Sequence, residues 1–392
     1  MATNKYWSLV ILTFFCVSVA VQVYSQDYCL SAAKSDALQV EIKKWENALR
    51  DRRYADLDPF LNGLVAAYEN GEKDDDTVER WFRIFRRDSP ALEPLHLEWI
   101  KLYPDSFAAH LAAAEYYSEV AHAKRGSRFA KDTSETQFKA MAESHALALS
   151  FLDRAEKLTK KPTLAIASRI YIMRSVGKRA DVVALFERGE RIDPRNIRVK
   201  AAFISSSSPK WGGSNGELEK LLAATRASNL SAGTKTFVEY LVVYEFADEV
   251  WRDERYADAI SFYERANRLC PAVEEILQKL LRLYSSQKQY TDMRQAADRY
   301  VNRRPESGWG YSQRAWANYY LSNMKSAMVD AERASAYGDS YGTYLLGWFY
   351  DKGKSTVARD ANKALELYTT ALSRGYARAQ PDVARLRAEL GK

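Results

Sequence analysis

The one glycine-rich segment of the chain, residues 211–216 (Trp-Gly-Gly-Ser-Asn-Gly), is the first candidate for chemistry because glycine-rich loops can cradle phosphate. A P-loop also needs a lysine and then a serine or threonine directly after its second conserved glycine, and no glycine of this segment is followed by such a pair. Ser214 and Glu217 instead have the spacing of a capping box, which opens a helix. The segment therefore predicts a structural turn in front of a helix over 217–226, and this reading is favoured over a ligand loop.

Catalysis requires groups that converge, and the sequence contains no recognised set of them. The GxSxG and HExxH motifs are absent, and no cysteine and histidine occur in a known catalytic context. Paired acids such as Glu274 and Glu275 are adjacent, so they point to different faces of a helix. Acids brought together from distant segments are left open by the sequence. We predict a protein that is not an enzyme.

Metal binding is not indicated either. The chain has three cysteines and four histidines, and their spacing does not match a zinc site. The charged run over 72–76 (Glu-Lys-Asp-Asp-Asp) lacks the alternating ligands and the glycine of a calcium loop. Asp76 is better explained as the N-cap of a helix over 77–87. We expect no metal and no cofactor.

Two clusters of basic residues could attract an acidic polymer or a carboxylate terminus. One surrounds Gly126 and consists of Lys124, Arg125, Arg128 and Lys131; the other consists of Arg83, Arg86 and Arg87. Solvated helix faces commonly carry such charges, and a formal net charge of +7 is a mild bias for 392 residues. The sequence therefore favours ordinary surface charge, and we expect no nucleic-acid partner.

The N-terminus predicts the compartment. Lys5 is followed by an apolar run over 8–21, and small or β-branched residues occupy the positions before a cleavage site at Ser25. The run is shorter than the roughly 20 residues that span a bilayer, so a cleaved signal peptide over 1–25 is favoured over an uncleaved anchor. The mature chain would begin at Gln26 without a transmembrane segment. We expect a periplasmic or secreted protein.

Two cysteines, Cys29 and Cys270, remain after the predicted cleavage, because Cys16 lies within the signal. In an oxidising compartment they can form a disulfide that ties the N-terminal segment to a later part of the chain. The sequence leaves open whether they pair or stay as two free thiols.

The second half of the chain contains a sequence pattern that repeats with a fixed period. Pro271 and Pro305 lie 34 residues apart, and the segment Tyr256–Asp258 recurs 34 residues later as residues 290–292. Alanines recur after two periods, at 259 and 266 and again at 327 and 334. This pattern is typical of the tetratricopeptide repeat, in which two antiparallel helices bury their apolar faces against neighbouring pairs. Segments 239–271, 272–305 and 306–339 resemble three such units.

The C-terminal segment has a different pattern. Residues 346–353 (Leu-Gly-Trp-Phe-Tyr-Asp-Lys-Gly) precede Asp360, and small residues and Tyr368 follow at helical spacing. This segment resembles a Sel1-like repeat, a slightly longer relative of the tetratricopeptide unit. A closing helix is expected over 381–390. Glycine at 347 would permit a close helix crossing, and glycine at 375 would end a helix.

The N-terminal half shows the same pattern less regularly. Residues 53–56 (Arg-Tyr-Ala-Asp) repeat residues 255–258 of the later repeats, and prolines at 162 and 194 enclose another helical hairpin. Residues 54–226 resemble the uncharacterised bacterial helical family known as domain of unknown function 4034. The most specific element of that resemblance is Pro209-Lys210-Trp211-Gly212-Gly213-Ser214. The resemblance implies an envelope or secreted helical protein and implies no chemistry.

We predict an all-α protein, a right-handed α-solenoid of antiparallel helical hairpins of the tetratricopeptide and Sel1-like type. The predicted parts are a signal peptide (1–25), an N-terminal helical domain (26–235), tetratricopeptide repeats (236–339), and a Sel1-like repeat with the closing helix (340–392).

Such stacks present a concave groove lined by the first helices of successive units. The residues predicted to bind a partner there are Tyr244, Tyr284, Arg314 and Asn318. The predicted function is a non-catalytic scaffold that binds protein or peptide in the bacterial cell envelope.

Two alternatives are kept. A helical-repeat enzyme acting on cell-wall polymer predicts a pair of acids facing each other in a deep cleft, one with raised proton affinity. A structural or assembly component predicts an exposed apolar patch on a terminal repeat.

Overall fold

The computed structural model describes residue 29, residues 36–127 and residues 132–392. Within these ranges the chain forms α-helices and short 3-10 helices and no β-strand, and consecutive helices pack against each other in pairs. The prediction of an all-α chain of helical hairpins is therefore confirmed. The chain divides into two compact units, one ending at Glu249 and one beginning at Val250. The predicted signal peptide lies outside the described residues.

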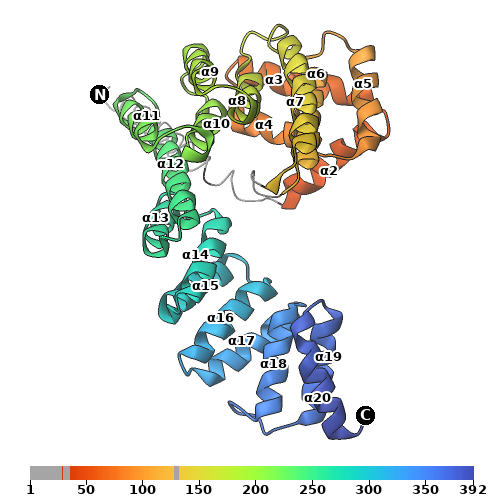
Figure 1. Ribbon diagram of the computed structural model, residues 1–392, viewed down its shortest axis with the longest axis vertical. Helices are drawn as coiled ribbons and strands as arrows, with labels where there is room; N and C mark the ends of the chain where they lie inside the picture. The colour runs from red at the N-terminus through yellow and green to blue at the C-terminus, as the bar shows by residue number, and fades with distance from the viewer. Residues whose placement is uncertain (1–28, 30–35, 128–131) are drawn as a thin grey trace, which may run out of the picture. The chain divides into compact units, whose positions relative to one another are not determined.

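The N-terminal unit contains α2 to α11 and most of α12 (Figure 1). They are α2 (Asp36–Arg50), α3 (Tyr54–Glu69), α4 (Asp75–Phe82), α5 (Glu93–Leu102), α6 (Phe107–Arg125), α7 (Glu135–Ala155), α8 (Thr163–Val176), α9 (Arg179–Ile192), α10 (Ile197–Ser206), α11 (Asn215–Ala227) and α12 (Ala232–Arg252). The division between the units falls inside α12, whereas the sequence suggested a boundary before residue 236.

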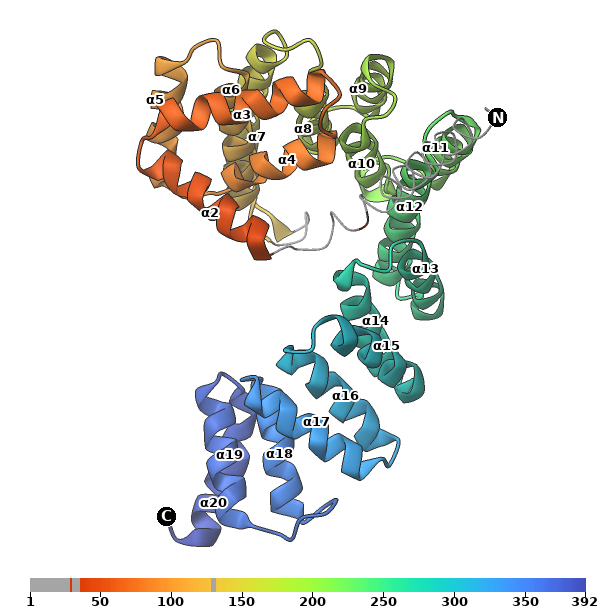
Figure 2. The same cartoon turned by 180° about the vertical axis from the view of Figure 1, so that it is seen from behind.

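A long hairpin, α6 and α7, lies at the centre of the N-terminal unit, and its two helices run side by side in both views (Figures 1 and 2). Ser106 and Ser134 cap them by accepting hydrogen bonds from Ala109 N–H (3.1 Å) and Gln137 N–H (3.3 Å). Alanines in α6, including Ala108 and Ala112, are fully buried. Small side chains at these positions let the neighbouring helices approach closely.

The predicted cap of α4 is corrected by the structure. Asp74, not Asp76, is the N-cap, and it accepts a 2.7 Å hydrogen bond from Thr77 N–H. Asp76 lies in the first turn, where its carboxylate is 2.7 Å from the guanidinium of Arg80 and 2.8 Å from that of Arg198. The sequence could not distinguish three consecutive aspartates, because each can cap a helix and only the tertiary contacts of Asp76 exclude it.

The C-terminal unit continues the series from the end of α12 (Figure 2). Its helices are α13 (Tyr256–Leu269), α14 (Glu274–Ser286), α15 (Tyr290–Arg303), α16 (Gly308–Tyr320), α17 (Met324–Ala336), α18 (Ser340–Lys352), α19 (Ala361–Ser373) and α20 (Gln380–Leu390). Each helix packs against the next one along the chain.

The 34-residue period reappears in the backbone of this unit. Glu254, Lys288 and Ser322 adopt left-handed conformations with φ values of 59°, 58° and 62°, although none of them is glycine. Each lies just before a second helix, and the following amide bonds back five residues, as Gln289 N–H does to the Tyr284 carbonyl (2.9 Å). This is the Schellman arrangement that ends a helix. The turn geometry therefore repeats as regularly as the sequence does.

Replacing Lys288 with glycine is expected to raise the free energy of unfolding by about 0.5–1 kcal/mol. A left-handed conformation costs an L-residue about 1–2 kcal/mol, and the greater freedom of glycine in the unfolded chain offsets part of that gain. Gln287→Gly is the control, because Gln287 has φ −90° and gains nothing from glycine. Urea unfolding of the full chain checks both variants, and a destabilised Lys288→Gly would contradict the assigned turn.

Small residues occupy the closest helix crossings, as the repeat requires. Ala259, Ala266, Ala327 and Ala334 are fully buried. A Cβ atom added to Gly342 would lie 2.2 Å from the Cβ of Ala334, and one added to Gly347 would lie 2.9 Å from the Tyr368 ring. Such contacts can be relieved only by moving whole helices apart. The expected role of Gly347 at a close crossing is confirmed.

The Sel1-like segment forms the hairpin α18 and α19 with the closing helix α20. Gly353 ends α18 with φ 57°, and Asp360 caps α19 by accepting a 2.9 Å hydrogen bond from Lys363 N–H. The carboxylate of Asp351 is buried between α18 and α20, where Arg385 donates to it at 2.5 Å. This ion pair fastens the last helix to the hairpin.

Two further properties concern the cysteines and the apolar character of the helices. Cys29 and Cys270 are both disulfide-bonded. Among the described residues, no helix has the length and apolar character that crossing a membrane requires.

Candidate partner-binding pocket

Three of the residues predicted to bind a partner lie in the C-terminal unit, and their polar groups contact neighbouring helices of the stack. Arg314 on α16 forms a two-point ion pair with Asp330 on α17 (2.7 and 2.9 Å) and also reaches Asp298 on α15 (2.9 Å). Asn318 is buried and donates to the same Asp330 carboxylate at 3.1 Å. These two residues therefore meet around one buried aspartate.

Tyr284 and Tyr244 lie apart from that cluster. Tyr284 on α14 is buried and donates a 2.9 Å hydrogen bond to Glu264 on α13. Burial and the neighbouring carboxylate raise the pKa of Tyr284 well above its usual value. Tyr244 belongs to α12 in the N-terminal unit, with its ring 6.0 Å from that of Tyr240. A partner-binding role for these four residues remains a prediction.

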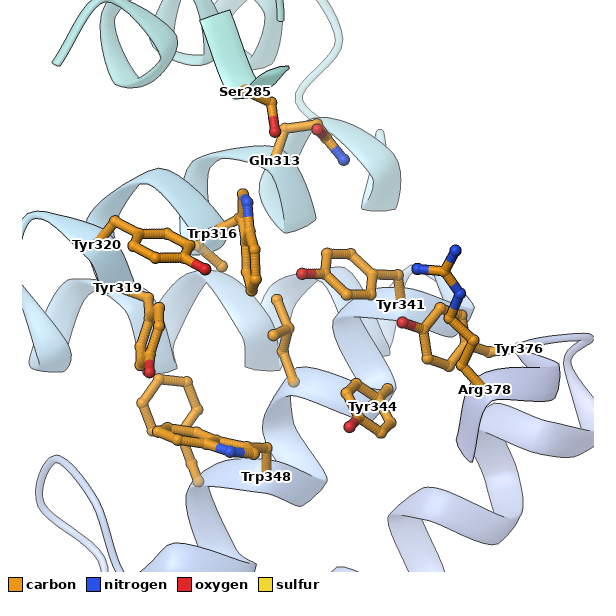
Figure 3. A pocket seen from close by; sticks show the side chains of 13 residues that line it. Ser285, Gln313, Trp316, Tyr319, Tyr320, Tyr341, Tyr344, Trp348, Tyr376 and Arg378 are labelled. Atoms are coloured by element: carbon orange, nitrogen blue, oxygen red, sulfur yellow. The ribbon is translucent and has the colours of Figure 1, made fainter. Parts of the chain in front are cut away.

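A pocket opens on the other face of α16, between α16, α18 and the 3-10 turn that precedes α20. It has a volume of about 600 Å³, and eight of its thirteen lining residues are aromatic. We call it the aromatic pocket; its lining is Ser285, Gln313, Ala315, Trp316, Tyr319, Tyr320, Tyr341, Tyr344, Leu345, Trp348, Phe349, Tyr376 and Arg378. Figure 3 shows the labelled rings surrounding a common space, with Gln313 at one end and Arg378 at one side.

Some rings of the pocket meet at steep angles, whereas Trp316 and Tyr319 lie nearly parallel, with 6.0 Å between centroids and 20° between planes. Trp316 meets Tyr320 edge to face (4.7 Å between centroids, 82° between planes), and Tyr319 meets Trp348 in the same way (5.0 Å, 82°). Such edge-to-face contacts are favourable and keep the rings in place without a ligand. The result is a preformed hollow that accepts an inserted group from several sides.

The polar groups of the aromatic pocket are few. Tyr344 donates to Asp382 on α20 at 3.1 Å, and burial together with this carboxylate raises the pKa of Tyr344 to about 12. Burial also raises the pKa values of Tyr341 and Tyr376, so these hydroxyls stay protonated at neutral pH. Arg378 is the only charged residue in the lining, and its side chain is hydrogen-bonded with that of Tyr376. The pocket thus combines neutral aromatic walls with one guanidinium.

Sequence reasoning missed the aromatic pocket, although a signal was present. Aromatic residues at 316, 319 and 320 and again at 341, 344 and 348 follow helical spacing on two successive first helices. Positions 316 and 320 share a face of α16, whereas 314 and 318 share a different face that is turned toward α17. Of the predicted residues, Arg314 and Asn318 lie on α16 and contact Asp330 of α17, outside the lining of the aromatic pocket.

The basic residues of the two predicted clusters, where the structure describes them, form contacts within the N-terminal unit. Lys124 donates to Ser144 (2.9 Å) and Arg125 to the carbonyl of Gly126 (3.2 Å), whereas Arg128 and Lys131 lie outside the described residues. The second basic cluster is ion-paired: Arg86, for example, lies 2.7 Å from Glu79 and 2.6 Å from Glu115.

The glycine-rich loop is a structural turn. Ser214 N–H donates to the Glu217 carboxylate at 3.0 Å, which is the backward half of the predicted capping box, and α11 follows. Arg174 lies over the Trp211 ring, 4.9 Å from its centroid. A Cβ atom added to Gly213 would lie 2.4 Å from the backbone of Ser207, so that glycine is required by close chain approach.

Acids with a raised pKa occur at two places among the described residues, and neither lies in the aromatic pocket. Burial raises the pKa of Asp75 to about 7, but its side chain is enclosed at the start of α4. Burial also raises the pKa of Glu190, whose carboxylate accepts from Lys200 at 2.5 Å. Within the same ranges no group of three or more histidine, cysteine, aspartate or glutamate residues is placed to hold a metal ion.

The chain was compared with family models, curated proteins and solved structures. No family model matches the chain, so the resemblance of residues 54–226 to the domain of unknown function 4034 family is not confirmed. No curated protein matches its sequence. A protective antigen of uropathogenic Escherichia coli with an SLR fold is similar at a TM-score of 0.41 and 15% identity, over 85% of this chain and 68% of that one.

Two other solved structures are similar at lower scores. Yeast Tom70 has a TM-score of 0.33 and 11% identity, over 91% of this chain and 90% of its own. The APC/C hetero-tetramer Cut9–Hcn1 has a TM-score of 0.31 and 13% identity, over 94% and 92%. The consecutive helical hairpins of this chain and their 34-residue period make it an α-solenoid of antiparallel helical hairpins.

Proposed function

We propose that this chain is a non-catalytic scaffold of the bacterial cell envelope that binds a protein or peptide partner in the aromatic pocket. The observation that carries the proposal is a preformed hollow of about 600 Å³ with aromatic walls, one guanidinium and no carboxylate in its lining. Volumes of this order suit a bulky side chain of a partner. Aromatic side chains contribute much of the binding energy where they enclose such a group.

The chemistry of the lining favours a particular kind of segment. An aromatic or aliphatic side chain would enter between Trp316 and Trp348, which approach from α16 and α18. A carboxylate on the same segment, either an acidic side chain or a chain terminus, would pair with Arg378. The edge-to-face contacts of Trp316 with Tyr320 and of Tyr319 with Trp348 interrupt the flat surface on which a row of sugar rings would stack. This favours a peptide over a polysaccharide.

The compartment is part of the proposal. Its support is the sequence of residues 1–25, with a lysine, an apolar run and small residues before position 26. A cleaved signal would expose the mature chain to the oxidising envelope, where disulfides persist. A relationship of residues 54–226 to the domain of unknown function 4034 family is proposed on the element Pro209–Ser214 and assigns no activity.

The test is selection from a random peptide library with the mature chain, prepared from an envelope fraction and checked by N-terminal sequencing for a start at Gln26. Selected peptides are expected to carry a bulky apolar residue close to a carboxylate. Trp316→Ala is expected to weaken their binding by at least tenfold, in line with the loss of a buried anchor contact.

Tyr337→Ala is the matched control, because Tyr337 is an exposed aromatic residue (50%) at the C-cap of α17, outside the pocket lining. This variant is expected to bind as the wild type does. Equal affinity of the Trp316→Ala and wild-type chains for every selected peptide would show that the aromatic pocket is not the binding site.

A further inference from the structure

A second pocket lies in the N-terminal unit, between α9, α10 and α11, and the proposed function does not use it. Its volume is about 620 Å³. Its inner wall is apolar: Phe186 and Phe203 stack with their centroids 4.1 Å apart, and Val183, Leu221 and Leu230 complete the lining around them. We call this the apolar pocket. Its size lies within the range of small-molecule sites.

The charged residues that line the apolar pocket balance one another. Three are acidic (Glu187, Glu190 and Glu217) and three are basic (Arg195, Lys200 and Lys220). The buried Lys200 is satisfied by Glu190 and by the carbonyl of Pro194, both at 2.5 Å. Glu217 is held by Arg179 at 2.7 Å. Glu187, Arg195 and Lys220 are exposed. A charged ligand would therefore lose its hydration without meeting an unused charge in the buried part of the pocket.

One buried polar group in this lining has no partner. Thr225 on α11 is 4% exposed, and its hydroxyl oxygen is buried without a hydrogen bond in the described structure. Buried hydroxyls in folded proteins are nearly always hydrogen-bonded, and leaving one unpaired destabilises the fold. A ligand that supplies the missing partner would recover that loss. The unpaired hydroxyl thus marks where a polar atom of a bound molecule would lie.

We propose that the apolar pocket binds a small uncharged molecule, aliphatic or aromatic, that offers one hydrogen-bonding group to the Thr225 hydroxyl. The apolar wall provides the binding energy through burial, and Thr225 orients the ligand. This site is independent of the aromatic pocket, which lies in the other unit and carries a guanidinium in its lining.

The test is fluorescence titration of the full mature chain with N-phenyl-1-naphthylamine, an uncharged aromatic amine with a single N–H group. The titration is made in the Trp316→Ala background so that the aromatic pocket contributes less to the signal. Saturable binding is expected. Ala224→Trp, which fills the pocket from an exposed position in its lining, should weaken binding at least tenfold.

Ala223→Trp is the control, because Ala223 is the exposed neighbour of Ala224 and does not line the pocket. Its affinity should equal that of the parent chain. Absence of saturable binding, or equal weakening by both tryptophan substitutions, would overturn the site. Competition by an uncharged partner peptide instead of by small molecules would overturn the ligand class.

Thr225→Val separates the role of the hydroxyl from that of shape. Valine keeps the volume and removes the unpaired oxygen, so the thermal midpoint should rise while the probe binds about fivefold more weakly, the loss of one neutral hydrogen bond. A lower midpoint would show that the hydroxyl has a partner within the protein. Unchanged affinity would show that it does not contact the ligand. Either result would overturn the assignment of Thr225.

Discussion

Arg314→Ala is expected to lower the local free energy of unfolding of α16 and α17 by roughly 2–4 kcal/mol, somewhat less than breaking a fully buried ion pair costs. The substitution leaves the buried carboxylate of Asp330, whose side chain is 5% exposed, with Asn318 as its remaining side-chain donor. It also removes the link from α16 back to Asp298 on α15. Hydrogen exchange of the α16 and α17 amides in the full chain measures the effect.

Arg294→Ala is the matched control for this prediction. Arg294 contacts the same Asp298 at 3.4 Å, but both side chains are 39% exposed and four residues apart on one helix. Such pairs contribute only a few tenths of a kcal/mol, so exchange should barely change. If Arg314→Ala kept native exchange protection and instead lost peptide binding, Arg314 would be a groove residue and not a clamp between hairpins.

The second large effect concerns Asp75, whose carboxylate is enclosed at the start of α4. Its Oδ2 accepts a 2.6 Å hydrogen bond from the Arg198 backbone N–H. The charge of Arg198 is already shared by Asp76 (2.8 Å) and Glu79 (3.4 Å). Burial therefore dominates, and it raises the pKa of Asp75 to about 7. The folded state holds a proton there that the unfolded chain, with a pKa of about 3.9, has lost.

This difference in bound protons determines how the free energy of unfolding changes with pH. Between pH 4 and pH 7 the folded state binds more protons at Asp75, so its contribution to stability falls as pH rises through this range. Asp75→Asn keeps an uncharged acceptor and removes the titration. The variant should match the wild type near pH 4 and exceed it at pH 8, by up to about 4 kcal/mol for a shift of this size.

Thermal midpoints of both chains from pH 4 to pH 8 check this prediction, and the difference between them is the quantity to compare. The pH dependence of each midpoint on its own also includes contributions from the four histidines. Burial lowers the pKa values of all of them: His96, His110, His122 and His145. These groups add stability as pH rises toward 6.5 and oppose Asp75.

Asp76→Asn provides a control of opposite sign. Asp76 neighbours Asp75, but it is ion-paired with Arg80 and Arg198, so losing its charge should destabilise the fold at neutral pH. Equal effects of the two substitutions at pH 8 would contradict the difference in their environments.

The two alternative functions make structural demands that can be compared with the described residues. An enzyme acting on cell-wall polymer needs two acids facing each other across a cleft, whereas Asp75 is enclosed and Glu190 is paired with Lys200. A terminal assembly surface needs a large exposed apolar patch; among the described residues, Leu97 and Leu102 are exposed on α5, whereas no large hydrophobic residue is strongly exposed on α18, α19 or α20. The aromatic pocket meets the demand of a binding scaffold more directly.

Much of the helical architecture could be predicted from short-range patterns. The tetratricopeptide hairpins, the turn at Gly353 and the cap at Asp360 all depend on residues within a few turns of each other. The alanines at 259 and 266 predicted close helix crossings, because the repeat pattern places small residues where adjacent helices cross, and both alanines are buried in the structure. The N-cap within residues 72–76 could not be predicted in the same way. Each of the three consecutive aspartates is a suitable N-cap residue, and only Asp74 caps the helix in the structure.

The amino-acid sequence by itself determined the helices, their 34-residue period and the small residues at their crossings, because those depend on local conformation and on contacts between adjacent hairpins. Only the tertiary structure decided which face of α16 lines the aromatic pocket. A helix turns about 100° per residue, so Arg314 and Trp316 face different neighbours. The packing of α17 and α18 against α16 places Arg314 between the carboxylates of Asp330 and Asp298 and leaves Trp316 in the lining of the aromatic pocket.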